Sequence, residues 1–249
     1  MTRTFRFALA TVAVAAAACG GSSTAHASAA CSLPTFGPGA DYHPAITPSD
    51  FSATVDNAYF PLPVGRTWLY KGMKDNEASV DVVTATKDTR VVDGVTARVV
   101  QDYLFLDGFL EEETKDYYAQ DRCGNVWYFG EDTAELSASG KVTSREGSFH
   151  AGVDGAQPGV FMQAAPELGR RFRQEWYQGH AEDTFKALDL AASATVPAGT
   201  YDHALRTEET TALEPGVVDN KYFAKGVGSV REIAVKGDKE TLELVAVIG

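Results

Sequence analysis

Three short stretches of the sequence contain acidic residues, and two of them also contain a histidine. GEDT contains Asp132, FHAGVDG contains Asp154, and GHAEDTF contains His180, Glu182 and Asp183. Carboxylate oxygens suit Ca²⁺ or Mg²⁺, and an added histidine suits a transition metal. None of the stretches has the ligand spacing of a known metal motif, and a chain with 34 acidic residues produces such clusters by chance. The sequence therefore predicts no cofactor, with one divalent metal at these five residues as the alternative.

Other catalytic patterns are weak. There is no G-x-S-x-G elbow for a serine nucleophile. The run Glu111, Glu112 and Glu113 offers carboxylates for acid–base chemistry, but such a run is also typical of an exposed strand. No catalytic residue is predicted, and the chain is interpreted as more typical of a non-enzymatic protein.

Aromatic side chains form a second kind of candidate site. In DYYAQDRCGNVWYFGEDT, strand alternation places Trp127 and Phe129 on one face and Val126 and Tyr128 on the other. Such a strand is either buried on both faces or lines a ligand cavity with one of them.

Residues 151–171, AGVDGAQPGVFMQAAPELGRR, are rich in glycine and proline and predict one long apolar loop. Long loops often cap the opening of a curved sheet. Val160, Phe161 and Met162 would either close over an apolar ligand or plug the core. The residues predicted to line a ligand cavity are Trp68, Tyr118, Trp127, Phe129, Phe161, Met162, Trp176 and Tyr177.

The elements that must position these side chains are strands. Asp93-Gly94 and Asp107-Gly108 each separate apolar or alternating runs, which is a strong hairpin signal. Residues 56–249 contain about 11–12 such runs in sequential order, without a helical period. An antiparallel meander of this length must curl, so the sequence predicts a single all-β domain, a strongly curved half-barrel or barrel.

The N-terminus has the pattern of an export signal. Basic residues precede a short apolar run that ends near Ala18, too short to span a membrane. Cleavage before Cys19 would leave a lipid-anchored cysteine and a tether, whereas cleavage after Ala27 would release the protein. Residues 1–27 are thus assigned to the signal and tether, and the proline-rich residues 28–55 to an extended arm.

Cys31 and Cys123 remain after either cleavage. In an oxidising compartment two remaining thiols predict a disulfide, between the arm and the turn before Trp127. The chain has 34 acidic and 22 basic residues and a net charge of −12. This charge disfavours nucleic acid and a basic membrane-binding surface, so membrane attachment is expected only through a lipid on Cys19.

Several stretches resemble a family of uncharacterised secreted or lipid-anchored proteins of actinobacteria. They are YFPLPVGRTWLYKG, DYYAQDRCGNVWYFGEDT, EGSFHAGVDGAQPGVFM, FRQEWYQGHAED and LEPGVVDNKYFAKGVGSVRE. The resemblance implies export but no activity. In architecture alone, the expected meander is similar to half-barrel lipoprotein carriers and to lipocalins.

The leading hypothesis is an exported, non-enzymatic β-domain that binds an apolar or amphipathic small molecule or lipid in a cavity of its sheet. The alternatives are a metal-assisted extracellular hydrolase and a cell-envelope interaction module without a small ligand. In each case the expected location is outside the cell or on the outer face of its membrane.

Overall fold

The structure, a computed structural model, describes residues 32–237 and 239–249. Residues 33–249 form one compact unit. The described residues contain strands and two short 3₁₀ helices, but no α-helix. Neither 3₁₀ helix is long or apolar enough to cross a membrane. The predicted signal segment and Cys19 lie outside the described residues. So does Cys31, and its disulfide with Cys123 therefore stays a prediction.

Strands follow one another along the whole described chain. Its first half contains η1 (Gly39–Asp41), η2 (Pro48–Asp50), β1 (Phe51–Ser52), β2 (Thr67–Lys74), β3 (Glu77–Val92), β4 (Val95–Leu106), β5 (Phe109–Asp121) and β6 (Val126–Leu136). Its second half contains β7 (Val142–Ser144), β8 (Phe149–His150), β9 (Gln157–Met162), β10 (Arg171–Arg173), β11 (Glu175–Trp176), β12 (Asp183–Val196), β13 (Gly199–Thr211), β14 (Val218–Ala224), β15 (Gly228–Lys236) and β16 (Glu240–Ile248).

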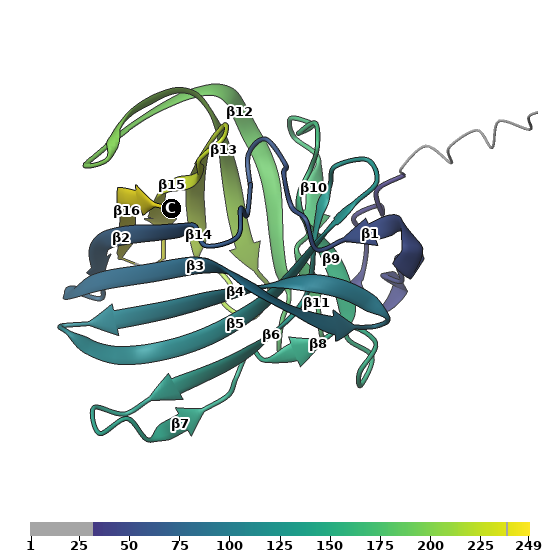
Figure 1. The fold of residues 1–249 in the computed structure, drawn as a ribbon, viewed down its shortest axis with the longest axis horizontal. Coiled ribbons are helices and arrows are strands. Elements are labelled where there is room, and N and C mark those ends of the chain that lie inside the picture. Colours follow the sequence, from purple (N-terminus) through teal and green to yellow (C-terminus); the bar gives the residue numbers. More distant parts are fainter. Residues whose placement is uncertain (1–31, 238) are drawn as a thin grey trace, which may run out of the picture. The chain divides into compact units, whose positions relative to one another are not determined.

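Thirteen of these strands form one antiparallel sheet that closes nearly into a barrel (Figure 1). Their order is β10-β12-β13-β14-β15-β16-β2-β3-β4-β5-β6-β9-β11. The first and last strands of this order are neighbours in the chain, with only Gln174 between them. The predicted all-β fold with a strongly curved antiparallel meander is confirmed.

Local turn chemistry determines the hairpins. Asp93 and Gly94 both have positive φ, 47° and 77°, and they join β3 to β4 through the pair Val92↔Val95. Asp107 and Gly108 join β4 to β5 in the same way. This two-residue geometry matches the twist of the flanking strands, which is why Asp-Gly predicted both turns correctly.

The long apolar loop expected over residues 151–171 is wrong in its central part. Residues 157–162 form β9, which pairs with β6 through Trp127↔Val160 and Val126↔Met162. Pro158 and Gly159 made the sequence of this strand resemble a loop, because both residue types are rare inside strands. Gly159 is needed at this position, since a Cβ would lie 2.2 Å from the carbonyl carbon of Gln174. The β10–β11 connection thus crosses β9 at backbone contact.

The strands of the barrel wall are buried on both faces. An inner cluster includes Val100, Tyr118, Val126 and Tyr128, and an outer cluster includes Val99, Tyr117, Trp127 and Phe129. These sets alternate along β4, β5 and β6, as strand geometry requires. The predicted division of Trp127 and Phe129 from Val126 and Tyr128 is therefore confirmed, together with burial on both faces.

The described part of the N-terminal arm covers the outer cluster. Leu33, Ile46 and Phe51 pack against it. The ring of Phe51 meets Trp127 and Phe129 edge to face, with centroids 5.9 and 5.2 Å apart. This cover explains why an outer barrel face can be as apolar as an interior.

Candidate functional site

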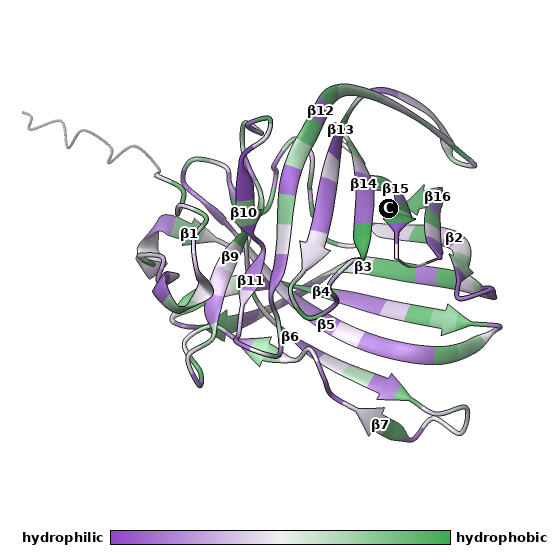
Figure 2. Cartoon of the chain, turned by 180° about the vertical axis from the view of Figure 1, so that it is seen from behind, coloured by the Kyte–Doolittle hydropathy of each residue, from purple (hydrophilic) through white to green (hydrophobic). Residues whose placement is uncertain are grey.

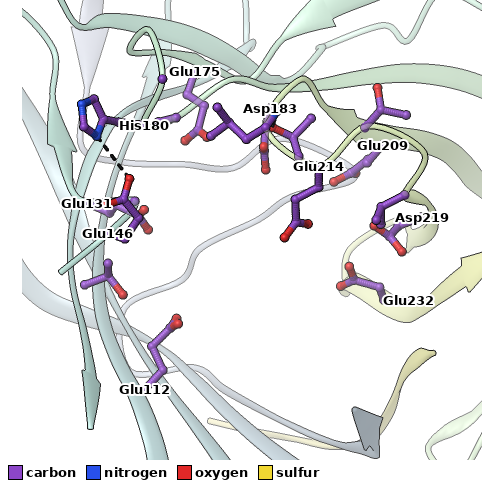
Figure 3. A pocket seen from close by; sticks show the side chains of 18 of the residues that line it. Glu112, Glu131, Glu146, Glu175, His180, Asp183, Glu209, Glu214, Asp219 and Glu232 are labelled. Atoms are coloured by element: carbon purple, nitrogen blue, oxygen red, sulfur yellow. Dashed lines mark hydrogen bonds and ion pairs between the residues drawn. The ribbon is translucent and has the colours of Figure 1, made fainter. Parts of the chain in front are cut away.

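The interior of the barrel contains an open cavity of about 730 Å³. Its wall is strongly acidic, and side chains from opposite sides point into a common space (Figure 3). Nine acidic residues line it, namely Glu112, Glu131, Glu146, Glu175, Asp183, Glu209, Glu214, Asp219 and Glu232. At the edge of the cavity, Nδ1 of His180 lies 3.2 Å from a carboxylate oxygen of Glu146.

A smaller cavity of about 200 Å³ adjoins the larger one, since Lys221 and Glu232 line both. Its wall combines apolar side chains with three further acids, Asp81, Asp102 and Asp116. The apolar part of this wall consists of Phe60, Tyr70, Val83, Val100, Tyr118, Phe161, Phe223 and Leu242. We call these two spaces the acidic chamber and the aromatic chamber.

Carboxylates therefore occupy most strands around the barrel. We call the following eight side chains the acidic belt, one each on β3, β4, β5, β6, β11, β12, β13 and β15: Asp81, Asp102, Asp116, Glu131, Glu175, Asp183, Glu209 and Glu232. Hydrophilic segments accordingly lie within β4, β5, β12 and β14 and not only at their turns (Figure 2). Among the described residues, Lys221 on β14 is the only lysine or arginine that lines either chamber.

Asp81 and Asp102 form a carboxyl pair on neighbouring strands. Burial raises the pKa of Asp81, and burial together with the charge of Asp81 raises the pKa of Asp102 well above its usual range. Both causes favour the protonated form of Asp102. The Oδ1 atom of Asp81 is buried without a hydrogen-bond partner in the described structure.

Asp116 and Glu131 form a second pair. They are opposite residues of β5 and β6, and the hydroxyl of Tyr128 lies 2.6 Å from Oδ1 of Asp116 and 3.0 Å from Oε2 of Glu131. Burial raises the pKa of Asp116 to about 7, against the hydrogen bond from Tyr128. Burial and the charge of Asp116 raise the pKa of Glu131 well above its usual range.

The wall of the acidic chamber formed by β11 and β12 also carries carboxyls with raised pKa values. Glu175 is buried, and both burial and the charge of Asp183 raise its pKa well above the usual range. The carboxyl of Asp183 faces the open part of the acidic chamber, and burial raises its pKa as well. Each carboxylate thus makes ionisation of the next one harder, because like charges repel strongly inside a protein.

Lys221 is the internal counter-charge. Its ammonium lies 3.1 Å from a carboxylate oxygen of Glu209 and 3.4 Å from one of Glu232. Burial alone would lower the pKa of Lys221, but these two carboxylates outweigh burial and raise it well above its usual value. For Glu232, burial prevails over the attraction of Lys221 and raises the pKa to about 7. One lysine therefore does not compensate the acids of the belt.

The aromatic residues predicted to bind a ligand separate into distinct groups. Tyr118 and Phe161 line the aromatic chamber, with ring centroids 4.9 Å apart. Trp68 and Met162 pack in the inner cluster without lining either chamber. Phe161, expected in a loop, points into the barrel from β9.

The remaining predicted aromatic residues line neither chamber. Trp127 and Phe129 belong to the outer cluster. The ring of Trp176 packs against the guanidinium of Arg173, 4.3 Å away, on the N-terminal arm side. Tyr177 stacks on His180 beside a separate hollow of about 190 Å³.

The five residues of the predicted metal site do not come together as one group. The described residues contain no set of three or more His, Cys, Asp or Glu side chains arranged to hold a metal ion. His180 and Asp183 line the acidic chamber, while the backbone amide of Gly179 donates to Glu182. Asp154 lines the separate hollow near Tyr177.

Asp132 points away from the chambers, opposite to Glu131. Its carboxylate accepts hydrogen bonds from Tyr117 and Arg90, and one of its oxygens lies 3.0 Å from Nε2 of His150. Burial opposes these contacts, but they prevail and lower the pKa of Asp132. Asp132 is therefore an ionised structural carboxylate on the outer side.

Most belt residues were not anticipated from the sequence. Asp81 shares its strand face with Val83, Asp102 with Val100, and Asp116 with Tyr118, so the acids alternate in phase with core residues. The presence of acidic residues on the same strand face as core residues is the sequence signal that could have identified the belt. Chemically, the arrangement offers ionisable acceptors beside an apolar wall, which suits a ligand with a cationic or proton-donating group and an apolar body.

Comparisons with known proteins give likeness of fold only. No family model matches the chain, and no curated protein matches its sequence. A protein of Bacteroides fragilis, assigned as exported and as having a YmcC-like fold, has 11% identity and a TM-score of 0.46, covering 78% of this chain and 100% of that one. A protein of Parabacteroides distasonis assigned as a lipoprotein has 11% identity and a TM-score of 0.40, covering 77% and 99%. The resemblance to actinobacterial secreted proteins stays a prediction.

Proposed function

We propose that this protein is an exported, non-enzymatic binding domain that holds an amphipathic small molecule inside its barrel. The observation that carries the proposal is the two-chamber interior, in which an aromatic wall adjoins an acidic wall at Lys221 and Glu232. The acidic chamber, at about 730 Å³, lies within the range of small-molecule sites in proteins.

The apolar part of the ligand is assigned to the aromatic chamber. Phe60, Tyr118 and Phe161 form a compact group there, with Phe60 4.5 Å from Phe161 and 5.1 Å from Tyr118 between ring centroids. Phe60 and Phe161 are only partly buried although they pack against the inner cluster. Partly accessible aromatic rings inside a barrel are suitable surfaces for an apolar chain or ring.

The polar part of the ligand is assigned to the acidic chamber, where carboxylates converge from several strands (Figure 3). A wholly apolar ligand would leave these groups unpaired, which is unfavourable for buried polar atoms. The amphipathic form of the ligand is therefore preferred over the purely apolar form. The metal-assisted hydrolase and the envelope interaction module stay predictions from the sequence.

Native mass spectrometry of the protein, purified after export, tests the proposal. We expect a co-purifying organic mass, or uptake of an added eight-carbon amphiphile such as octyltrimethylammonium at one molecule per chain. The variant Phe161→Ala removes aromatic surface from the chamber, whereas Val91→Ala changes an exposed apolar residue as a control. Absence of any adduct with amphiphiles of either charge, or equal uptake by Phe161→Ala and the parent, would contradict the proposal.

A further inference from the structure

The carboxyls of the acidic belt are crowded inside the barrel, and this crowding favours protons stored on them. Asp81 and Asp102 lie on neighbouring strands, and burial together with the charge of Asp81 raises the pKa of Asp102 well above its usual range. Tyr128 has a single hydroxyl hydrogen, yet its oxygen is within bonding distance of both Asp116 and Glu131. A proton on one of the two carboxyls would complete both contacts, and burial raises the pKa of both carboxyls.

These proton-holding pairs are next to each other. Asp102 on β4 lies opposite Thr114 on β5, which lies opposite Thr133 on β6. Two residues further along the same strands, Asp116 on β5 lies between Val100 on β4 and Glu131 on β6. The titratable groups that interact with Asp116 are Asp81 on β3, Asp102 on β4, Glu112 and Tyr118 on β5, Tyr128 and Glu131 on β6, Glu175 on β11 and Lys221 on β14. Only Lys221 among them is cationic.

We infer that the ligand of the barrel carries a cationic amine or quaternary ammonium group and that it binds in exchange for protons stored on the acidic belt. This inference rests on the proposed function and assigns the chemical class of its ligand. When the cation enters, a neutral carboxyl loses its O–H proton to solvent and becomes the carboxylate that pairs with the cation. Charge is conserved, because one positive charge enters for each proton that leaves.

Independent observations point to the same class of ligand. Oδ1 of Asp81 is buried, lines the aromatic chamber and has no hydrogen-bond partner in the described structure. The protein itself contains an ammonium group paired with belt carboxylates, because Nζ of Lys221 forms ion pairs with Glu209 and Glu232. Aromatic faces such as those of Tyr118 and Phe161 favour quaternary ammonium groups through cation–π attraction. An anionic headgroup would instead meet repulsion from nearly every side.

The exchange makes binding depend on pH. Asp116 has a pKa of about 7 because burial opposes its charged form. A carboxyl that must ionise for binding holds its proton more firmly as the pH falls below that value. For one exchanging proton with a pKa of about 7, linkage predicts that the Kd rises by about 30-fold between pH 8 and pH 5.5.

Isothermal titration calorimetry with octyltrimethylammonium tests the inference, because this probe has a permanent charge and cannot release a proton itself. Titration at pH 7 in phosphate and in Tris, which differ in ionisation enthalpy, measures the protons released. We expect between about half a proton and one proton per bound cation, together with the weaker binding at pH 5.5. 1-Octanol serves as the neutral probe and octyl sulfate as the anionic probe, and both should bind more weakly.

Variants separate proton storage from general charge. Asp102→Asn and Glu131→Gln should each lower the number of protons released, whereas Asp202→Asn removes an exposed charge outside both chambers and should leave it unchanged. Cation binding without proton release and with a pH-independent Kd would overturn the inference and leave the proposed function standing. Preferred binding of octanol or octyl sulfate would have the same meaning. Failure of all three probes to bind would overturn the proposed function itself.

Discussion

Asp116 and Glu131 face each other across β5 and β6, and both contact the hydroxyl of Tyr128. Two carboxyls in such a position cannot both ionise without strong repulsion. The ligand-free protein therefore favours the protonated form, and its stability must depend on pH in the opposite direction from that of most proteins with paired surface acids.

The first prediction concerns this pH dependence. The folded-state pKa of Asp116 is about 7, raised above the value near 4 of an unfolded chain. The folded state thus binds more protons between about pH 4 and pH 7, so the stabilisation is present below pH 4 and is lost as the pH rises through 7. We expect the Tm of the ligand-free protein to be higher at pH 5.5 than at pH 8 and to become less dependent on pH in Asp116→Asn.

The same variant should stabilise the ligand-free protein at pH 8 by about 1–3 kcal/mol, because a neutral amide replaces a group that is costly to ionise when buried. Asp202→Asn is the matched control for loss of one carboxyl on the surface. Urea denaturation at both pH values measures the difference. Equal destabilisation by Asp116→Asn at pH 5.5 and pH 8 would show that the carboxyl is not a source of the pH dependence.

The second prediction concerns closure of the barrel. In Gly159→Ala the new Cβ would lie 2.2 Å from the carbonyl carbon of Gln174, and backbone atoms cannot move aside as a flexible side chain does. We expect a loss of about 3 kcal/mol in the free energy of unfolding. Gly37→Ala adds the same methyl group where nothing lies within 4 Å and should change stability by less than about 0.5 kcal/mol. A similar effect of the two substitutions would exclude close packing at Gly159.

The third prediction concerns Asn57, whose side chain links the segment before β2 to the β5–β6 turn by hydrogen bonds. Its Nδ2 donates to the carbonyls of Gly124 and Gln163, and its Oδ1 accepts from the amides of Tyr59 and Phe60. Asn57→Asp keeps the acceptor but sets a carboxylate oxygen against two carbonyls, so we expect a loss of about 3 kcal/mol at pH 7.

Thermal unfolding at pH 7 and pH 4.5 distinguishes the cause of that loss. Relative to the parent, Asn57→Asp should be less destabilised at pH 4.5, where protonation of the introduced carboxyl restores one donor. Asn76→Asp, in the exposed β2–β3 turn, is the control and should have a small effect at both pH values. A destabilisation that does not change with pH would indicate lost packing and not lost hydrogen bonds.

The fourth prediction separates the two faces of the aromatic strands. Trp127→Phe removes a hydrogen bond to Asp121 and some packing beneath Phe51, so it should destabilise the protein by about 1–2 kcal/mol. Because Trp127 lies in the outer cluster, the Kd for octyltrimethylammonium should stay within about twofold. Phe161→Ala should instead weaken binding by about tenfold, through loss of apolar contact area. Calorimetry and urea denaturation of both variants give the comparison, and the reverse pattern would refute this division.

The sequence predicts the long strands well, because their signals are local. The Asp93-Gly94 and Asp107-Gly108 turns, which join the long strands β3, β4 and β5, lie where the sequence places them. Strand β1 was not predicted, because its two residues lie in the segment assigned to the extended arm. Strands as short as β1, β8 and β11 have no period of their own and pair with a longer neighbour.

The acidic belt was missed for a nonlocal reason. A carboxylate in an alternating strand ordinarily faces water, so Asp81 and Asp102 give no local sign that their face is the inside of a barrel. Which face becomes the interior depends on pairing between distant parts of the chain, such as that of β16 with β2. Of the aromatic residues predicted to bind a ligand, Tyr118 and Phe161 line the aromatic chamber, whereas Trp127 and Phe129 lie in the outer cluster. The sequence does not separate these two groups, because aromatic residues occupy both faces of the strands.

Closure of the barrel at Gln174 has one further consequence. Strands β10 and β11 act as a clasp of six residues that holds the two edges of the sheet through only five paired residues. Such short pairings should be the first to open in hydrogen exchange. The clasp also carries Glu175, a member of the acidic belt, so a cation paired with this carboxylate would bind the clasp to the opposite wall. On the proposed function, occupancy of the interior and closure of the ring would then be one coupled equilibrium, in which a bound ligand would slow its own release.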